Sequence, residues 1–188
     1  MQFFQGFFSQ LPELETERLT LRPLRMSDAR DMYAYAQDPE VSRYVMWSAH
    51  TSVLQSRAFI RACIRQYRRG EPGSFAIVLK ESGRMIGTVG FMWIQEENRS
   101  AEVGYSLGRA YWNRGIMTEA LRAVVAFGFD TLRLNRIEAQ HDLRNPASGR
   151  VMAHVGMRQE GILRQRLKNK GKFVDVALYA ILRSDPRL

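Results

Sequence analysis

Three short strand-like segments in a row, followed by an amphipathic helix, constrain the fold of this chain more than any other feature. The segments are "SFAIVLK", "RMIGTVGFMWI" and "SAEVGYSL", separated by the turn residues "ESG" and "EENRS". Their β-branched and aromatic residues, bounded by turns, predict an antiparallel meander. A meander has one face to bury, so helices are expected to cover it.

The segments before the meander predict one strand and two helices. "ERLTLRPL" alternates apolar and polar residues, as a half-buried strand does. Ser27 is expected to cap a helix that runs to about Gln37. A second helix is expected over residues 52 to 69, ended by Gly70 and Pro72.

After the meander, a helix is predicted from about Met117 to Leu132, and then a strand at "RIEAQHD". Asn145 followed by Pro146 is a strong helix-start signal. Two more strands are expected around the basic turn "KNKGK". This order of elements predicts an α+β protein, an α/β sandwich around a largely antiparallel sheet.

The composition is that of one globular domain. No Pro-, Gly- or Ser-rich linker divides the 188 residues, so a single domain over 1–188 is expected, with an aromatic arm at 1–14. The single Cys63 excludes a disulfide framework and a Cys-based zinc site, and favours a reducing, cytoplasmic compartment. No apolar run approaches the roughly 20 residues of a membrane helix.

The arm and the charge leave alternatives open. The aromatic residues of the arm either cap the domain or contact a dimer partner or another protein; they are Phe3, Phe4, Phe7 and Phe8. The net charge of +9 favours acidic partners such as nucleotides, polyphosphate-bearing cofactors or RNA-rich assemblies. Scattered basic surface is the simpler explanation of that charge.

The loop "YWNRGIMTE" precedes the helix at Met117 and is typical of an anion site. A helix start presents free N–H groups and the positive end of its dipole. Gly115 lets a ligand approach the backbone, Arg114 adds positive charge, and Thr118 offers a hydroxyl. The alternative is a tight turn. The chain has no P-loop or GxGxxG motif, and its three His residues lack metal-site spacing, so no metal is expected.

Two longer stretches carry a resemblance to a known family. "AEVGYSLGRAYWNRGIMTEAL" and "LNRIEAQHDLRNPASGRVMAHVGMRQEGILR" resemble the GNAT N-acetyltransferase superfamily, in the branch of RimJ- and RimL-like ribosomal-protein N-terminal acetyltransferases. "ETERLTLRPLRMSDA" and "DVALYAIL" resemble the opening and closing segments of that branch. The resemblance implies a GNAT fold: a twisted, mostly antiparallel mixed sheet of about seven strands, flanked by about four helices and splayed between two central parallel strands.

The resemblance also implies acetyl-CoA as cosubstrate. The family's phosphate loop, Gln/Arg-x-x-Gly-x-Gly/Ala, falls on residues 112 to 117, where Gly115 matches while Trp112 and Met117 depart from the pattern. A cradle of backbone N–H groups is therefore expected. The implied coenzyme A-binding residues are Asn113, Arg114, Gly115, Ile116, Met117, Thr118 and Asn145.

Two catalytic residues follow from the same resemblance. Glu102 matches a frequent family Glu and is the expected general base, directly or through water; the alternative is a surface Glu in an ion pair. The family's Tyr acid would fall on Met152, which cannot donate a proton. Ser148 is the expected replacement, with an ordinary helix Ser as the alternative; Tyr105 and Tyr111 are less favoured.

The implied function is acetyl-CoA-dependent acetylation of a primary amine, with a protein N-terminal α-amine as the first-choice acceptor. A small-molecule amine is one alternative. Another is a non-catalytic domain that binds acyl-CoA, or RNA through "RQRLKNKGK". A homodimer is common in this branch. No membrane partner is expected, and nucleic acid only indirectly, through a ribosome.

Overall fold

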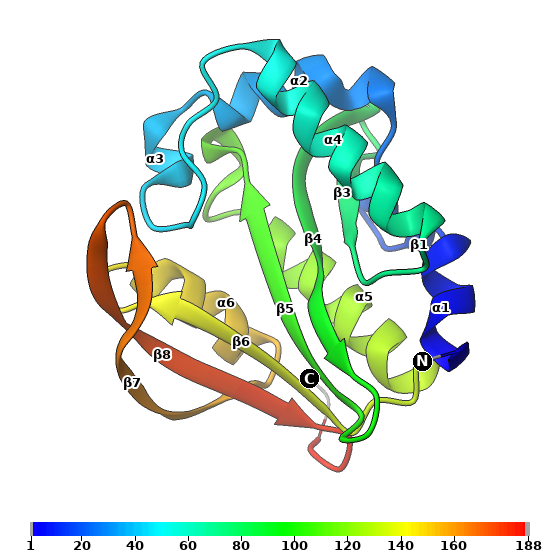
Figure 1. Ribbon diagram of the computed structural model, residues 1–188, viewed down its shortest axis with the longest axis vertical. Helices are drawn as coiled ribbons and strands as arrows, with labels where there is room; N and C mark the ends of the chain where they lie inside the picture. The colour runs from blue at the N-terminus through cyan, green and yellow to red at the C-terminus, as the bar shows by residue number, and fades with distance from the viewer. Residues whose placement is uncertain (1, 187–188) are drawn as a thin grey trace.

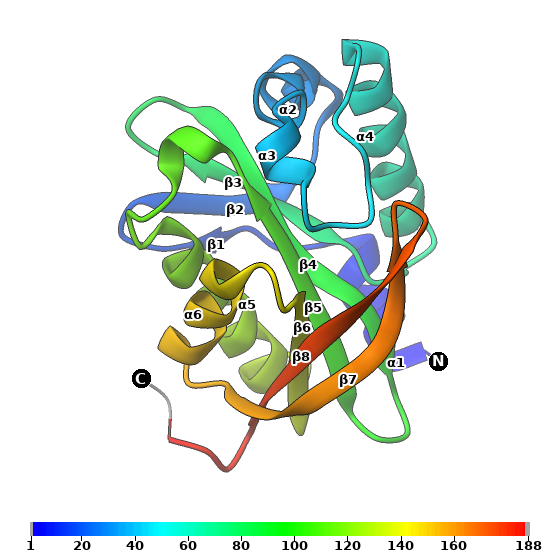
Figure 2. The same cartoon turned by 90° about the vertical axis from the view of Figure 1, so that its left-hand side faces the viewer.

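A single mixed sheet forms the centre of the molecule in the computed structural model, which describes residues 2–186 (Figures 1 and 2). The strand order is β1-β2-β3-β4-β5-β6-β8-β7. Neighbouring strands are antiparallel except β5 and β6, which pair in parallel. The strands are β1 (Leu14–Glu15), β2 (Leu19–Pro23), β3 (Ser74–Leu79), β4 (Arg84–Gln95), β5 (Ser100–Leu107), β6 (Arg136–Asp142), β7 (Arg158–Asn169) and β8 (Lys172–Leu182).

Helices cover both faces of this sheet. α2 and α4 lie on the face turned to the viewer in Figure 1, and α5 and α6 lie behind it. No helix within residues 2–186 is long and apolar enough to cross a membrane. The α-helices are α1 (Gln2–Ser9), α2 (Ala29–Ala36), α3 (Pro39–Ser42), α4 (Val53–Arg68), α5 (Ile116–Asp130) and α6 (Pro146–His154), and the 3₁₀ helices are η1 (Met26–Asp28) and η2 (Arg109–Tyr111).

The predicted α+β class and meander are confirmed, with differences in the element count. Strands β3, β4 and β5 follow one another antiparallel, as expected. The described residues form eight strands where about seven were expected, because the two residues of β1 pair with β2. They form six α-helices where about four were expected, because α1 and α3 were missed.

The expected cap at Ser27 is wrong. Ser27 lies inside η1, and α2 begins only at Ala29. The carboxylate next to it, that of Asp28, accepts hydrogen bonds from the Arg25 amide at 2.7 Å and from both terminal nitrogens of Arg22 at 2.8 and 2.9 Å. A buried ion pair therefore fixes this turn where a hydroxyl cap was expected.

The aromatic arm packs on the domain. The Phe8 ring is fully buried and meets the Phe91 ring edge to face, with centroids 6.0 Å apart. Phe4 and Phe7 are partly buried against the same core. The side chain of Phe3 lies outside the described part of the chain. Burial of Phe8 explains why a segment with a central Gly and several Phe residues is helical, since tertiary packing overrides weak local propensity.

Replacement of Asp28 by Ala tests the buried ion pair. Arg22 and Asp28 are 11% and 6% exposed, so the change leaves a guanidinium buried without its partner. We expect a loss of about 3 kcal/mol in the free energy of unfolding, measured by urea denaturation. Glu40→Ala is the control, because it breaks an exposed pair with Arg43 and should cost less than about 1 kcal/mol. Equal losses in the two variants would contradict the argument.

Candidate active site

The sheet opens between β5 and β6. The two strands pair at only three positions, which end with Glu102 opposite Glu138. Beyond that point β5 stays paired with β4 as far as Leu107, and β6 stays paired with β8 as far as Asp142. The facing edges of β5 and β6 are therefore not paired with each other past Glu102, and the sheet has an opening in its middle.

Glu102 lies where this opening begins, and neutral donors hold its carboxylate. Trp93 Nε1 donates to Oε2 at 2.7 Å, and Gln140 Nε2 donates to Oε1 at 2.9 Å. Within residues 2–186, no Lys or Arg forms an ion pair with Glu102. The alternative of an ion-paired surface Glu therefore does not fit. The other amide atom of Gln140, Oε1, is buried and has no hydrogen-bond partner among the described residues.

Glu102 and Tyr105 lie on opposite faces of β5, because side chains alternate along a strand. Ser106 shares the face of Glu102, and it contacts the hydroxyls of Thr88 and of Tyr35 on α2. Tyr105 points the other way, toward α6. The side chains of β5 beside the opening therefore differ between the two faces of the sheet. Glu102 and Ser106 lie on the side of α2, and Tyr105 lies on the side of α6.

Tyr105 and Ser148 form a hydroxyl pair on the α6 side. The Tyr105 hydroxyl lies 3.0 Å from Ser148 Oγ and donates to the Ser148 carbonyl at 3.0 Å. Burial raises the pKa of Tyr105, and the hydrogen bond with Ser148 offsets this only in part. The phenol is therefore protonated at neutral pH and can donate a proton or a hydrogen bond. The expected donor Ser148 thus has a partner that the sequence did not reveal.

The start of α5 presents open backbone groups. Gly115 precedes the helix with φ of 70°, the left-handed conformation that glycine adopts without strain. The Glu119 amide donates to the Gly115 carbonyl at 3.0 Å, so the amides of Ile116, Met117 and Thr118 precede the first helical hydrogen bond. A Cβ at Gly115 would meet nothing closer than Arg18 at 3.6 Å, so this end of the helix is accessible.

Other residues of the predicted loop serve the loop itself. Trp112 Nε1 donates to the Leu107 carbonyl at 2.7 Å, which explains an indole at this position of the loop. Ile116 and Met117 are buried in the core, so only their backbone groups can face a ligand. Asn113 has a positive φ of 57°, and the Arg114 guanidinium lies over the Tyr111 ring.

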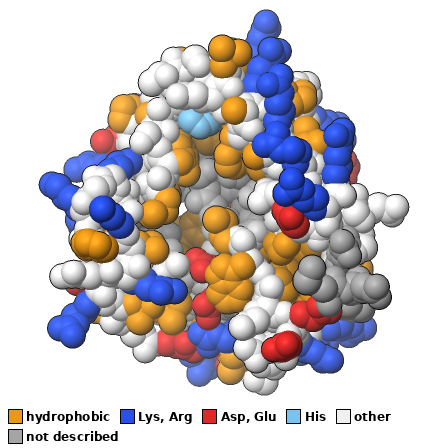
Figure 3. Space-filling view, viewed as in Figure 1, with side chains coloured by type: hydrophobic (Ala, Val, Ile, Leu, Met, Phe, Trp, Pro, Cys, Tyr) orange, Lys and Arg blue, Asp and Glu red, His pale blue; other side chains and the backbone are white. Residues whose placement is uncertain are grey.

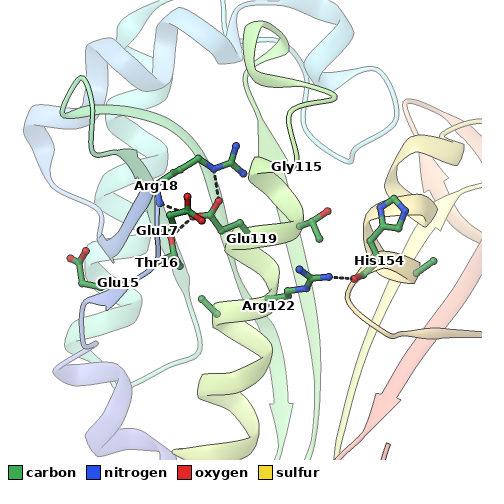
Figure 4. A pocket seen from close by; sticks show the side chains of 11 residues that line it. Glu15, Thr16, Glu17, Arg18, Gly115, Glu119, Arg122 and His154 are labelled. Atoms are coloured by element: carbon green, nitrogen blue, oxygen red, sulfur yellow. Dashed lines mark hydrogen bonds and ion pairs between the residues drawn. The ribbon is translucent and has the colours of Figure 1, made fainter. Parts of the chain in front are cut away.

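Glu119 ties the turn between β1 and β2 to the start of α5 (Figure 4). Its carboxylate accepts hydrogen bonds from Thr16 Oγ1 at 2.6 Å, the Arg18 amide at 2.8 Å and Arg18 Nε at 2.6 Å. The Arg18 side chain also donates to the Arg114 carbonyl at 2.9 Å. Burial alone would raise the pKa of Glu119, but these hydrogen bonds outweigh it and lower the pKa.

We call the hydrogen bonds of Glu119 with Thr16 and Arg18 the latch. A groove of about 990 Å³ lies beside this latch, between the first turns of α5 and the end of α6 (Figure 4). Arg122 crosses it and donates to the His154 carbonyl at 2.7 Å. The groove thus adjoins the open amides at the start of α5. Its lining residues are Glu15, Thr16, Glu17, Arg18, Gly115, Thr118, Glu119, Arg122, Ala123, Ala153 and His154.

At the start of α6, the side-chain amide of Asn145 is not used to cap the helix. Asn145 occupies the N-cap position and Pro146 the first helical position, as expected, but the Asn145 side chain makes no capping hydrogen bond. The hydrogen bond that would explain this Asn as a helix cap is therefore not formed. Met152 is buried in the core at 1% exposure. Residues 2–186 hold no cluster of three His, Cys, Asp or Glu side chains that could bind a metal.

The far end of the opening is bridged. Lys170, in the turn between β7 and β8, donates to the Ser42 carbonyl at 2.5 Å, at the end of α3. The Arg144 guanidinium, held by Asp142, lies over the Tyr44 ring. Figure 3 shows the face toward the viewer hollowed near its centre, with apolar side chains around the hollow and basic ones at its rims.

Comparisons with known proteins agree with this geometry. The family model described as "Acetyltransferase (GNAT) domain" matches residues 18–158. The chain is 38% identical to the uncharacterized N-acetyltransferase p20 of Bacillus licheniformis, over 92% of this chain and 97% of p20. It is 25% identical to the [ribosomal protein uS5]-alanine N-acetyltransferase of Escherichia coli, over 96% of each. A GNAT acetyltransferase structure from Bacillus anthracis superposes with a TM-score of 0.83 at 26% identity, covering 93% of this chain and all of that one.

Glu119→Gln tests the latch through its pH dependence. Because the folded-state pKa is lowered, the ionised carboxylate stabilises the fold above the unfolded-state pKa, and this contribution is lost as the pH falls through the folded-state pKa. We expect the variant to lose about 1–2 kcal/mol in the free energy of unfolding at pH 7. The difference in the free energy of unfolding between wild type and variant should shrink as the pH falls below about 4. Denaturant unfolding at a series of pH values measures this difference. Glu17→Gln, an exposed neighbour, should show no such difference; a pH-independent loss in Glu119→Gln would refute the assignment.

Proposed function

The chain belongs to the GNAT acetyltransferase family, and we propose that it transfers the acetyl group of acetyl-CoA to the N-terminal α-amine of a protein. The observation that carries this proposal is the opening of the sheet directly after Glu102. On one face lies the Glu102 carboxylate, which is held by neutral donors only, and toward the other lies the Tyr105–Ser148 pair. Such a passage lets an amine and a thioester approach the same point from opposite faces.

The start of α5 is the proposed site for the diphosphate of acetyl-CoA. The backbone amides from Asn113 to Thr118, the left-handed Gly115 and the Arg114 charge are the groups that would hold it, as helix starts hold phosphates. Asn145, whose side chain makes no capping bond, would bind the part of the molecule that enters the opening. The groove beside Glu119 gives the nucleotide end room along the surface.

Glu102 is the proposed general base. The acceptor amine is protonated at neutral pH, and its lone pair must be freed before it can attack the thioester carbonyl. Glu102 takes one proton from the ammonium group, directly or through water. Its two neutral donors, Trp93 and Gln140, fix the carboxylate in place without neutralising its charge. The amide bond forms as the carbon–sulfur bond breaks. The nitrogen then loses a second proton, which balances the proton that the departing sulfur gains, so the reaction releases one net proton through Glu102.

The Tyr105–Ser148 pair is the proposed donor to the departing sulfur. The thiolate of coenzyme A needs one proton or a strong hydrogen bond. The Ser148 hydroxyl is too weak an acid to act alone. The Tyr105 hydroxyl lies 3.0 Å from both the Ser148 carbonyl and Ser148 Oγ, so its one proton can turn from the carbonyl to Oγ while the Ser148 hydroxyl donates to the sulfur. Tyr105, on β5, and Ser148, on α6, thus act as one unit.

The acceptor assignment has separate support. The similar protein from Escherichia coli is named for the alanine of ribosomal protein uS5. The face of the molecule that carries α2 is hollowed near its centre (Figure 3), which gives a chain end room to approach the sheet from that side. A small-molecule amine is the competing acceptor. Turnover of an N-terminal peptide panel against a small-amine panel distinguishes the two.

Gly115→Asp and Gly115→Asn form a matched pair for the donor site. Both side chains tolerate the left-handed backbone, but only Asp places a negative charge at the proposed diphosphate. Acetyl-CoA at about 100 times its dissociation constant adds roughly 2.7 kcal/mol, a rise in the melting temperature of about 5–10 °C for a chain of this size. Thermal unfolding should show this rise in wild type and most of it in the Asn variant. A rise of equal size in the Asp variant would move the diphosphate away from α5.

Glu102→Gln tests the base. The amide can keep the contact with Trp93 but cannot take a proton, so kcat should fall at least about 100-fold while the thermal shift with acetyl-CoA persists. Release of the coenzyme A thiol is the readout, with an N-terminal peptide panel and a small-amine panel as acceptors. Glu138→Gln is the control. Glu138 forms an ion pair with Arg136 on the same strand, β6, and the variant should retain most activity. Turnover of small amines alone would reassign the acceptor, and full activity of Glu102→Gln would remove Glu102 as base.

A further inference from the structure

α4 carries a stripe of four arginines that the proposed reaction does not use. The arginine stripe consists of Arg57, Arg61, Arg65 and Arg68, all exposed. Their spacing of four, four and three residues places them on one side of the helix. Steps of four residues advance about 6 Å along a helix, so the stripe is a nearly straight row of guanidinium groups. Figure 3 shows basic side chains gathered over α4, beside the central hollow.

The stripe has no counter-charge of its own. α4 contains no Asp or Glu. Among residues 2–186, none of the four arginines forms an ion pair or a side-chain hydrogen bond, whereas Arg136, for example, pairs with both Glu138 and Glu160. The opposite side of α4 packs into the core through Ile60, Cys63 and Tyr67. Four like charges in a row repel one another, and an anionic partner along the row would remove that repulsion.

We propose that the arginine stripe binds the phosphate backbone of single-stranded nucleic acid. One straight row of charges matches one row of phosphates, and a phosphate backbone carries a charge at every step whatever its sequence. The planar guanidinium fork suits phosphate oxygens, and all four cations are Arg. This surface lies outside the acetyl-transfer site and stands independently of it.

The surroundings of the stripe favour phosphate over an acidic protein. Protein interfaces have an apolar, well-packed core, while nucleic-acid interfaces are more polar and more positively charged. Ala58 and Gln66 are exposed near the arginines and are small or polar. Two large apolar side chains of α4 are also exposed: Leu54 lies at one end of the stripe, and Phe59 lies about 160° around the helix from Arg57 and Arg61. The stripe thus offers charge without an apolar centre.

The stripe is also a better candidate than the basic turn at the other rim of the hollow. In that turn, Lys170 is engaged with the Ser42 carbonyl, and the Lys168 ammonium lies over the Phe173 ring. The stripe has no such internal contacts, so its four charges are available to a ligand.

The test is the salt dependence of binding to a fluorescently labelled 12-nucleotide uridine RNA, followed by anisotropy. Four phosphate contacts on a single strand give a slope of log K against log salt of about −2.8, or about 50-fold weaker binding between 50 and 200 mM salt. The variant Arg57→Gln, Arg61→Gln, Arg65→Gln should reduce the slope to about −0.7, a change of less than about threefold over the same range.

The matched control removes the same charge elsewhere. Arg99→Gln, Arg133→Gln, Arg150→Gln changes three exposed arginines outside α4 and should keep the wild-type slope. The thermal shift with acetyl-CoA, measured on all three proteins, reports the donor site separately, so its failure bears on the proposed function and not on the stripe. An equal slope in wild type and the α4 variant, an equal loss in the control variant, or tighter binding of oligo-glutamate than of RNA would each overturn the proposal.

Discussion

The short parallel pairing of β5 and β6 is the constraint on which the rest of the structure depends. Three paired positions join the two halves of the sheet, and past Glu102 the strands separate. Unpaired backbone groups at a buried edge are costly unless another group satisfies them. The same separation leads β5 into the loop that begins α5 and leads β6 into the turn that begins α6. One local event in strand pairing therefore places the carboxylate, the helix start and the free Asn145 side chain around a single opening.

The packing behind the opening keeps it in place. Gly128 on α5 allows the helix to approach β6 so closely that a Cβ would lie 2.6 Å from the Ile137 side chain. Gly149 does the same for α6, where a Cβ would lie 2.6 Å from His141 Nε2. Both helices that carry the proposed coenzyme A contacts can thus pack closely against β6, because glycine has no side chain at these two positions. The positions of their first turns follow from this close contact.

The sequence predicted the elements well where pattern and position agree. The meander, α4, β6 and the Asn145–Pro146 helix start need only local information, and the structure has them within a few residues. The sequence does not predict α1, because this helix depends on the burial of Phe8 against Phe91, which lies 83 residues away in the chain. The Ser27 cap failed because an ion pair between Arg22 and Asp28 determines that turn.

Candidate site residues could be chosen from sequence motifs, but their partners in space could not. Gly115 and Glu102 could be placed by motif, whereas the bonds from Gln140 to Glu102 and between Tyr105 and Ser148 join positions 38 and 43 apart in the chain. No spacing rule connects such pairs; only the strand register does. The same holds for the arginine stripe, whose periodicity is visible in the sequence but whose exposure and lack of counter-charge are not.

The contact of Lys170 with the Ser42 carbonyl changes the topology of the passage through the sheet. The elements around the opening form a closed ring. On one side they are β5, β4, β3, β2 and α3, and on the other side they are β6, β8 and the β7–β8 turn, which the hydrogen bond joins to α3. The opening is consequently an eyelet and not a notch. A ligand that reaches from one face of the sheet to the other would therefore have to pass endwise through a closed rim.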